Sequence, residues 1–173
     1  MRTAHLAATL AGLAVAVPAA AQTPKSSAPR EPAAHDVFVA VLSGAYEVPP
    51  IETQATGTAE LSLVGSQLHY RLHVDSIGDI TGAYIHLGGA GETTPAVADL
   101  FDGVKAGPTS GVLSSGTLAM ADVHGTTMRQ LRQALQHDDA YVTVHTLAHP
   151  GGELRGQLRR QPSVASRQAT HQG

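Results

Sequence analysis

Apolar and polar residues alternate with a period of two through most of the chain between about residues 36 and 159. The clearest example is residues 57–63, in which Ala and Leu alternate with Thr, Glu and Ser. This alternation predicts a half-buried β-strand, because successive side chains of a strand point to opposite faces. Residues 37–42 are apolar at nearly every position, which predicts a strand with two apolar faces.

One stretch departs from this pattern, because Met128, Leu131 and Leu135 recur at helical spacing. They predict one amphipathic helix with Thr126 as its N-cap and with its apolar side in the core. We expect a mainly β fold, an antiparallel β-sandwich or barrel of about 7–8 strands, with one short α-helix near residues 126–136. Turn residues bound the further expected strands at about 68–74, 80–87, 97–101, 112–119, 140–147 and 153–159.

The two ends of the chain differ in composition from this body. Residues 1–21 have the charge, apolar run and small-residue site of a secretory signal peptide, and the run is too short to span a bilayer with margin. Residues 22–35 form a Pro/Ser-rich linker and residues 160–173 a polar tail, and both are expected to be disordered. We therefore expect one domain over residues 36–159, in a secreted or periplasmic protein without stable membrane insertion after signal cleavage.

Composition excludes several kinds of partner and ligand. The net charge is −3 with 11 Lys and Arg, and aromatic residues make up 3% of the chain, so nucleic acid is not an expected partner. The chain has no cysteine, which removes disulfides and thiolate ligands, but it has 10 histidines. A metal site would therefore use imidazole together with oxygen ligands.

Strand alternation decides which histidines can meet. Tyr84 and His86 share one face of their expected strand, and Thr143 and His145 share one face of another. If these strands are neighbours, the two imidazoles converge. The alternative is that His86 and His145 only form hydrogen bonds to backbone or hydroxyl groups at a sheet edge.

Two imidazoles do not complete a metal site. A third ligand could come from His149 in the loop 147–152, or from Tyr84 if the metal stabilised its phenolate. Imidazole suits copper and zinc, and copper is our first expectation and zinc the second.

Three charged residues are further candidates. Glu47, just before Pro49 and Pro50, is expected to fix a turn by accepting backbone N–H bonds. Glu153 and Arg155 are two positions apart and share one face, so they could form a charge pair, or Arg155 could clamp a carboxylate. The alternative is that they pin the last hairpin through cross-strand contacts. Hydrolase, phosphate-loop and zinc-protease motifs are absent from the sequence.

Four stretches in order resemble the CHRD (chordin) domain family, over about residues 36–159. They are Leu42-Ser43-Gly44-Ala45-Tyr46-Glu47-Val48-Pro49-Pro50, Thr56-Gly57-Thr58-Ala59, Ala83-Tyr84-Ile85-His86-Leu87-Gly88, and Tyr141-Val142-Thr143-Val144-His145-Thr146 followed by Pro150-Gly151-Gly152-Glu153-Leu154-Arg155-Gly156-Gln157. The resemblance implies an extracytoplasmic β-sandwich, found in secreted growth-factor binders of the chordin type and as stand-alone bacterial modules. Family members commonly have Ala-His-Ile-His where this chain has Tyr84 in place of the first histidine.

Two functions follow as expectations. The first is an exported, non-catalytic module that binds a metal ion or an extracytoplasmic protein through the edge with His86 and His145. The second is a copper-dependent redox enzyme, because the family stretch is loosely similar to the copper strand of copper–zinc superoxide dismutases. Tyr84 in place of an imidazole favours the first.

Overall fold

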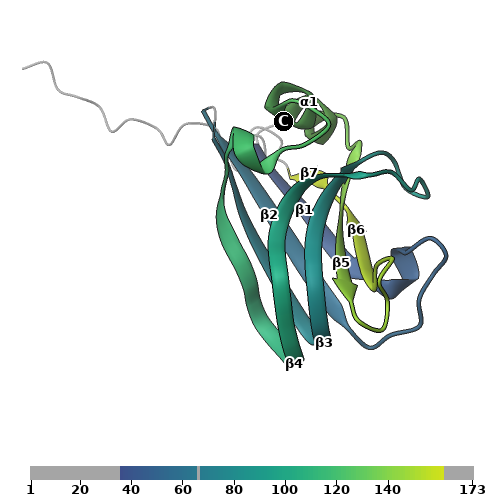
Figure 1. Ribbon diagram of the computed structural model, residues 1–173. Coiled ribbons are helices and arrows are strands. Elements are labelled where there is room, and N and C mark those ends of the chain that lie inside the picture. Colours follow the sequence, from purple (N-terminus) through teal and green to yellow (C-terminus); the bar gives the residue numbers. More distant parts are fainter. Residues whose placement is uncertain (1–35, 66, 162–173) are drawn as a thin grey trace, which may run out of the picture. The chain divides into compact units, whose positions relative to one another are not determined.

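The computed structural model describes residues 36–65 and 67–161 (Figure 1). The signal peptide predicted at residues 1–21 and the linker predicted at 22–35 lie outside the described residues. Of the segment 160–173 predicted as a tail, Arg160 and Gln161 are described, and they belong to a strand.

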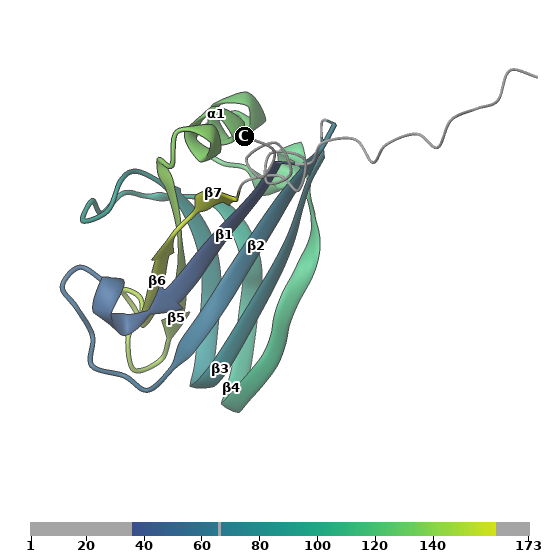
Figure 2. The ribbon, with the colours of Figure 1, turned by 180° about the vertical axis from the view of Figure 1, so that it is seen from behind.

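The described residues form seven antiparallel strands, five of which close into a barrel. The barrel strands pair in the order β2-β1-β6-β5-β3, and β3 pairs again with β2 (Figures 1 and 2). Strand β4 pairs with β3, and strand β7 pairs with β1. The prediction of a mainly β, antiparallel fold is confirmed, in its barrel form. The strands are β1 (Asp36–Ser43), β2 (Thr56–Val64), β3 (Gln67–Leu87), β4 (Ala96–Leu118), β5 (Ala140–Thr146), β6 (Leu154–Gln157) and β7 (Arg159–Gln161).

Strand β3 organises the barrel because it is long enough to pair with three strands. Strand β4 runs along one edge of β3, and the other edge is shared by β2 and then β5. Between the two halves Ser76 and Asp79 adopt positive φ angles of 55° and 49°, and the pairing register shifts there. These irregularities bend the strand from one neighbour to the next.

The same bend corrects the predicted strand boundaries. Residues 68–74 and 80–87 were predicted as separate strands, as were 97–101 and 112–119, but each pair belongs to one continuous strand, β3 or β4. The Asp, Gly and Pro residues between them were taken as turn signals. They lie at bulges instead, where an extra residue interrupts pairing without ending the strand.

Side-chain alternation fills the barrel as predicted. On β1, Phe38, Ala40 and Leu42 are fully buried, while Val41 on the opposite face is 63% exposed. On β3 the inward residues include Leu68 and Leu72, both fully buried. The core is therefore mostly aliphatic, as the low aromatic content requires.

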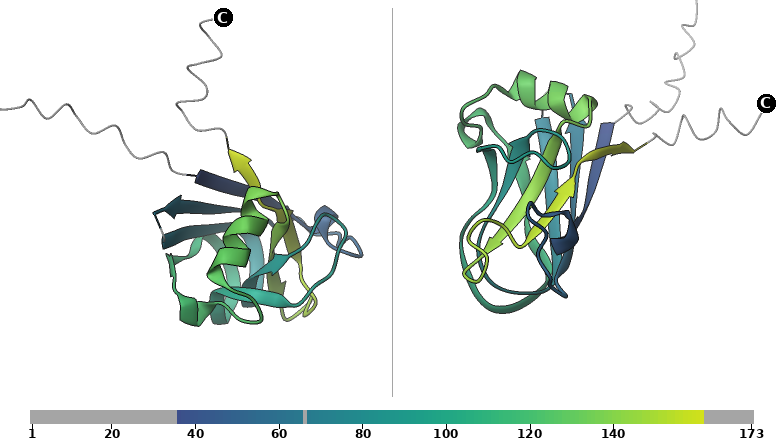
Figure 3. Two further views of the ribbon diagram at one scale, coloured as in Figure 1. Left: turned by 90° about the horizontal axis from the view of Figure 1, so that it is seen from above. Right: turned by 90° about the vertical axis from the view of Figure 1, so that its right-hand side faces the viewer.

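Helix α1 (Met128–Gln136) lies across one end of the barrel (Figure 3). Leu131 and Leu135 are fully buried, which confirms the predicted apolar stripe. The N-cap is Thr127 and not Thr126, because the Thr127 hydroxyl accepts from Gln130 N and the Gln130 side chain accepts from Thr127 N. This reciprocal pair is a capping box, which Thr126 is one position too early to form. Among the described residues, every helix is too short or too polar to cross a membrane.

Candidate functional site

The site lies on the outer face of the barrel, where β3 and β5 pair. Tyr84 is opposite Thr143, and His145 is opposite Gly82, so the outward residues of the two strands form one patch. Ile85 and Val144, which alternate with them, are fully buried inside the barrel. The two strands are thus neighbours, which was the condition for the two imidazoles to converge.

A hydrogen-bonded chain joins the two histidines through Thr143. His86 Nε2 lies 2.9 Å from the Thr143 hydroxyl oxygen, and His145 Nε2 lies 3.0 Å from the same oxygen. The two Nδ1 atoms lie 2.7 Å from the carbonyl oxygen of Thr94 and 2.8 Å from that of Pro150, respectively. Both rings are thus fixed at both nitrogens.

The protonation of this chain follows from its partners. A carbonyl oxygen only accepts, so Nδ1 of His86 and of His145 must each carry a proton, and in a neutral ring Nε2 is then an acceptor. The Thr143 hydroxyl has one proton to give to two acceptors. One Nε2 lone pair is therefore left without a donor whenever both rings are neutral.

Burial also keeps both rings neutral. It is the main cause that lowers the pKa of His86 and of His145 below 6.5, because a desolvated imidazolium is unfavourable. For His86, the charge of Arg155 and the proximity of His145 lower the pKa further, while the carbonyl of Thr94 opposes the shift. The result is a pair of neutral imidazoles whose unprotonated nitrogens face one point.

Two tyrosines complete the walls of the patch. The Tyr84 ring meets the His145 ring edge to face at 5.1 Å between centroids, and the Tyr141 ring is stacked on His86 at 4.7 Å. Burial, with smaller contributions from Asp102 and Asp99, raises the pKa of Tyr84 above 10.0. A phenolate at Tyr84 is therefore disfavoured in the metal-free protein.

These side chains border a cavity of about 320 Å³, which is also lined by Glu47 and Arg155. His149 is not among its lining residues; it lies in the turn after β5, where its backbone N–H donates to the Thr146 hydroxyl. Among the described residues, no group of three or more His, Cys, Asp and Glu side chains is placed to hold a metal ion. The structure thus brings together His86, His145 and Tyr84, but not His149.

The three charged candidates have separate environments. Glu153 accepts hydrogen bonds at 2.7 Å from the hydroxyls of both Thr53 and Thr146 and joins two loops. Arg155 instead lies over the Tyr141 ring, 3.5 Å from its centroid, and donates to the carbonyl of Gly89. Within residues 36–65 and 67–161, no ion pair joins Glu153 to Arg155.

Glu47 is buried beside Gly152. The Oε1 atom of Glu47 has no hydrogen-bond partner in the described part of the chain. Burial raises the pKa of the Glu47 carboxyl, while the Val48 backbone N–H and the Arg155 charge oppose the rise. Gly152 has a φ of +125°, and a Cβ there would collide with the Glu47 carboxylate. The carboxylate therefore packs against a position that only glycine can fill.

Sequence reasoning missed the linking role of Thr143 and the part played by Thr94. The alternation along β5 places Thr143 on the face of His145, so its position was visible, but its hydroxyl contacts were not. Thr94 lies in the loop 88–95, for which the sequence has no periodic signal. Its carbonyl reaches His86, and its hydroxyl donates to the carbonyl of Leu87.

Comparison with known proteins agrees with this architecture. The model of the CHRD domain matches residues 38–158. Chordin of Xenopus laevis is 30% identical over an alignment of 134 residues, which covers 72% of this chain but 13% of that protein. No solved structure matches the chain significantly. Because the CHRD family model matches well over half of this chain, the chain belongs to the CHRD domain family.

Proposed function

We propose that this chain is an extracytoplasmic CHRD module that binds a metal ion, copper before zinc, through His86 and His145, and that it catalyses no reaction. The observation behind the proposal is that both Nε2 atoms lie within hydrogen-bond distance of one oxygen, Thr143 Oγ1. If the Thr143 side chain rotates its hydroxyl away, an ion between the rings is faced by two imidazole lone pairs. Export is part of the proposal and rests on the signal peptide expected at residues 1–21.

The outer hydrogen bonds support a ligand role. Metal-binding histidines usually donate their second ring N–H to a carbonyl or carboxylate, which fixes the tautomer and orients the ring. Both His86 and His145 have such a bond, to the carbonyls of Thr94 and Pro150.

The small number of ligands favours copper bound without turnover. Structural zinc sites are closed by four ligands, and no third His, Cys, Asp or Glu side chain joins the pair in the described part of the chain. Imidazole suits copper as well, and a redox catalyst needs both a complete ligand set and an open position. Tyr84, with its raised pKa, is a poor replacement for the imidazole that family members commonly have at this position.

A copper(II) titration followed by calorimetry and electron paramagnetic resonance tests the proposal. Wild type is expected to bind one ion with nitrogen hyperfine coupling, and a His86→Gln/His145→Gln variant is expected to lose that site. The matched control is His69→Gln/His73→Gln, because these histidines lie on the outward face of β3 about 13 Å apart and cannot share an ion. Thermal unfolding of each variant shows that the barrel is intact.

Equal copper binding by wild type and the His86/His145 variant would refute the site. A superoxide dismutation assay on the copper-loaded protein separates the two functions, since turnover abolished by the double variant would favour the redox enzyme. If no ion binds at all, the remaining expectation is an extracytoplasmic protein partner. Sequencing the N-terminus of the exported protein tests the predicted cleavage.

A further inference from the structure

A second cavity, of about 450 Å³, lies on another part of the outer barrel surface. Its floor is apolar and consists of Val39 and Val41 on β1, with Tyr46 beside them. Val41 is 63% exposed and Tyr46 is exposed as well. Strand β1 therefore has one face in the core and an apolar second face that the described residues leave accessible.

One guanidinium, that of Arg155, borders this apolar floor. The residue is only 3% exposed, yet within the described ranges no carboxylate lies in ion-pair distance of it. It stacks on Tyr141, and one Nη2–H donates to the carbonyl of Gly89 at 3.1 Å. Since a guanidinium has five N–H donors, and burial of an unpaired charge is unfavourable, Arg155 can still accommodate an anion.

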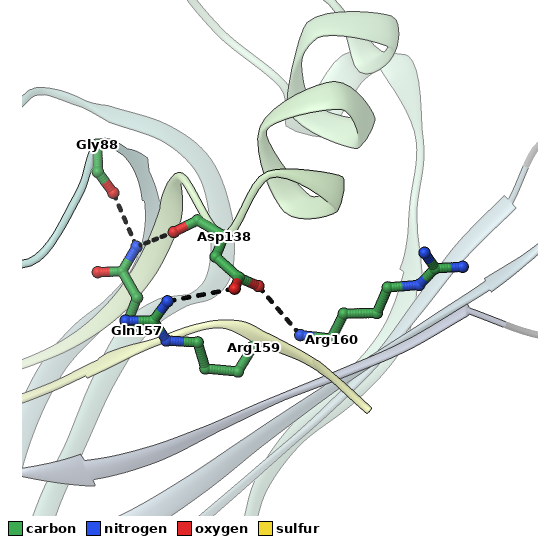
Figure 4. A network of polar contacts seen from close by, with 5 residues as sticks. All are labelled: Gly88, Asp138, Gln157, Arg159 and Arg160. Atoms are coloured by element: carbon green, nitrogen blue, oxygen red, sulfur yellow. Dashed lines mark hydrogen bonds and ion pairs between the residues drawn. The ribbon is translucent and has the colours of Figure 1, made fainter. Parts of the chain in front are cut away.

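The other cation at this cavity is already paired. Arg159 Nη1 lies 3.2 Å from Oδ2 of Asp138, whose Oδ1 accepts from the Arg160 backbone N–H (Figure 4). The Gln157 amide donates to the carbonyls of Gly88 and Asp138 and holds the cavity wall in place. The charge of Arg159 is therefore balanced by an ion pair, whereas Arg155 forms no ion pair within the described ranges. Its guanidinium interacts electrostatically with the buried carboxylate of Glu47, on the side of the histidine cavity.

We propose that this cavity binds a small monocarboxylic acid with an apolar body. The carboxylate pairs with the Arg155 guanidinium, and the apolar body lies over Val39, Val41 and Tyr46. Guanidinium and carboxylate are matched in shape and charge, and their hydrogen bonds are stronger than neutral ones. Burial of the apolar floor under the ligand contributes about 25 cal/mol of favourable binding free energy per Å² of apolar surface removed from water. The proposal does not depend on a metal at His86 and His145.

The test is an NMR titration of the metal-free protein with octanoate and, separately, with octanol. Octanoate is expected to shift the amide signals of Val39 and Val41 saturably. Octanol, which lacks the charge, is expected to bind about tenfold or more weakly, because a hydrogen bond to a charged group is worth about 1.5–3 kcal/mol. Arg155→Gln is expected to reduce the octanoate affinity by a similar factor.

A surface variant keeps the test independent of folding. Val41→Glu puts a negative charge on the exposed floor and should abolish octanoate binding, whereas Val104→Glu, at a 72% exposed position on β4 outside the cavity, should leave it unchanged. Three results would each overturn the proposal: no saturable shift, equal affinity for octanoate and octanol, or octanoate binding that survives Val41→Glu. Shifts confined to Thr94 and Thr143 would also overturn it, because they would place the acid in the histidine cavity.

Discussion

Replacement of Thr143 by Val tests the hydrogen-bonded link between the two histidines. Thr143 is 4% exposed, and its hydroxyl oxygen lies 2.9 Å from His86 Nε2 and 3.0 Å from His145 Nε2. Valine has nearly the same shape, so the change removes the hydroxyl without opening a cavity. A buried acceptor left unpaired costs about 1–3 kcal/mol. With both rings neutral the hydroxyl satisfies only one Nε2, so we expect this cost once and not twice.

The cost should rise as the pH falls. When one ring takes up a proton, its Nε2–H donates to Thr143 Oγ1, and the hydroxyl donates to the other ring. Both contacts are then hydrogen bonds, and Val at position 143 removes both. Urea unfolding at about pH 8 and again near pH 5.5 measures the difference in the free energy of unfolding between wild type and variant.

Two further variants isolate the hydroxyl. Thr143→Ser keeps it and should lose only about 1 kcal/mol for the missing methyl group, with the same pH dependence as wild type. Thr58→Val, on the exposed face of β2, should change stability by less than about 0.5 kcal/mol. If Thr143→Val is as stable as Thr58→Val at both pH values, the hydroxyl does not link the rings.

Three other predictions follow from the same contacts. Burial lowers the pKa of His86 and His145 below 6.5, so near and below that pH the unfolded chain binds more protons than the folded one. The free energy of unfolding should therefore fall as the pH drops from about 7 to 5. In urea unfolding, the His86→Gln/His145→Gln variant should show a smaller fall. Tyr84→His restores the imidazole that family members commonly have at this position and should raise copper affinity about tenfold or more in a titration against a competing chelator. Unchanged affinity would mean that position 84 does not contribute to the site. Leu131→Ala should cost about 2–5 kcal/mol in thermal or urea unfolding, whereas Leu147→Ala, at an exposed position, should cost little.

Much of the fold could be predicted because strand alternation is a local property. The order of apolar residues fixes which side chains share a face, so it predicted that His86 and His145 converge if their strands are neighbours. The pairing of β3 with β5 meets that condition. The contacts of their Nδ1 atoms could not be predicted in the same way. They depend on the carbonyls of Thr94 and Pro150, which come from loops without periodicity.

The errors in the predicted strand boundaries have a physical cause as well. Ser76 and Asp79 belong to residue types that usually end strands, but here they adopt left-handed conformations inside β3. Pairing with β4 continues between them, where Ile77 and Gly78 pair with Thr109 and Pro108, and that pairing involves residues far apart in sequence. The partner of Arg155 was left open for the same reason, because only the pairing of β5 with β6 brings its side chain over Tyr141.

The two proposed sites share Arg155, which lines both cavities, and should therefore influence each other. His86 stacks on Tyr141 from β3, and the Arg155 guanidinium contacts the same ring from β6. After burial, the Arg155 charge is one of the causes that lower the pKa of His86, and the same charge opposes a metal ion at its Nε2. A carboxylate on Arg155 would neutralise that charge, so it should favour both a proton and a metal ion at His86. Since such coupling is reciprocal, an ion at the histidines should in turn strengthen binding of the acid, and the module would hold each ligand most tightly when both are present.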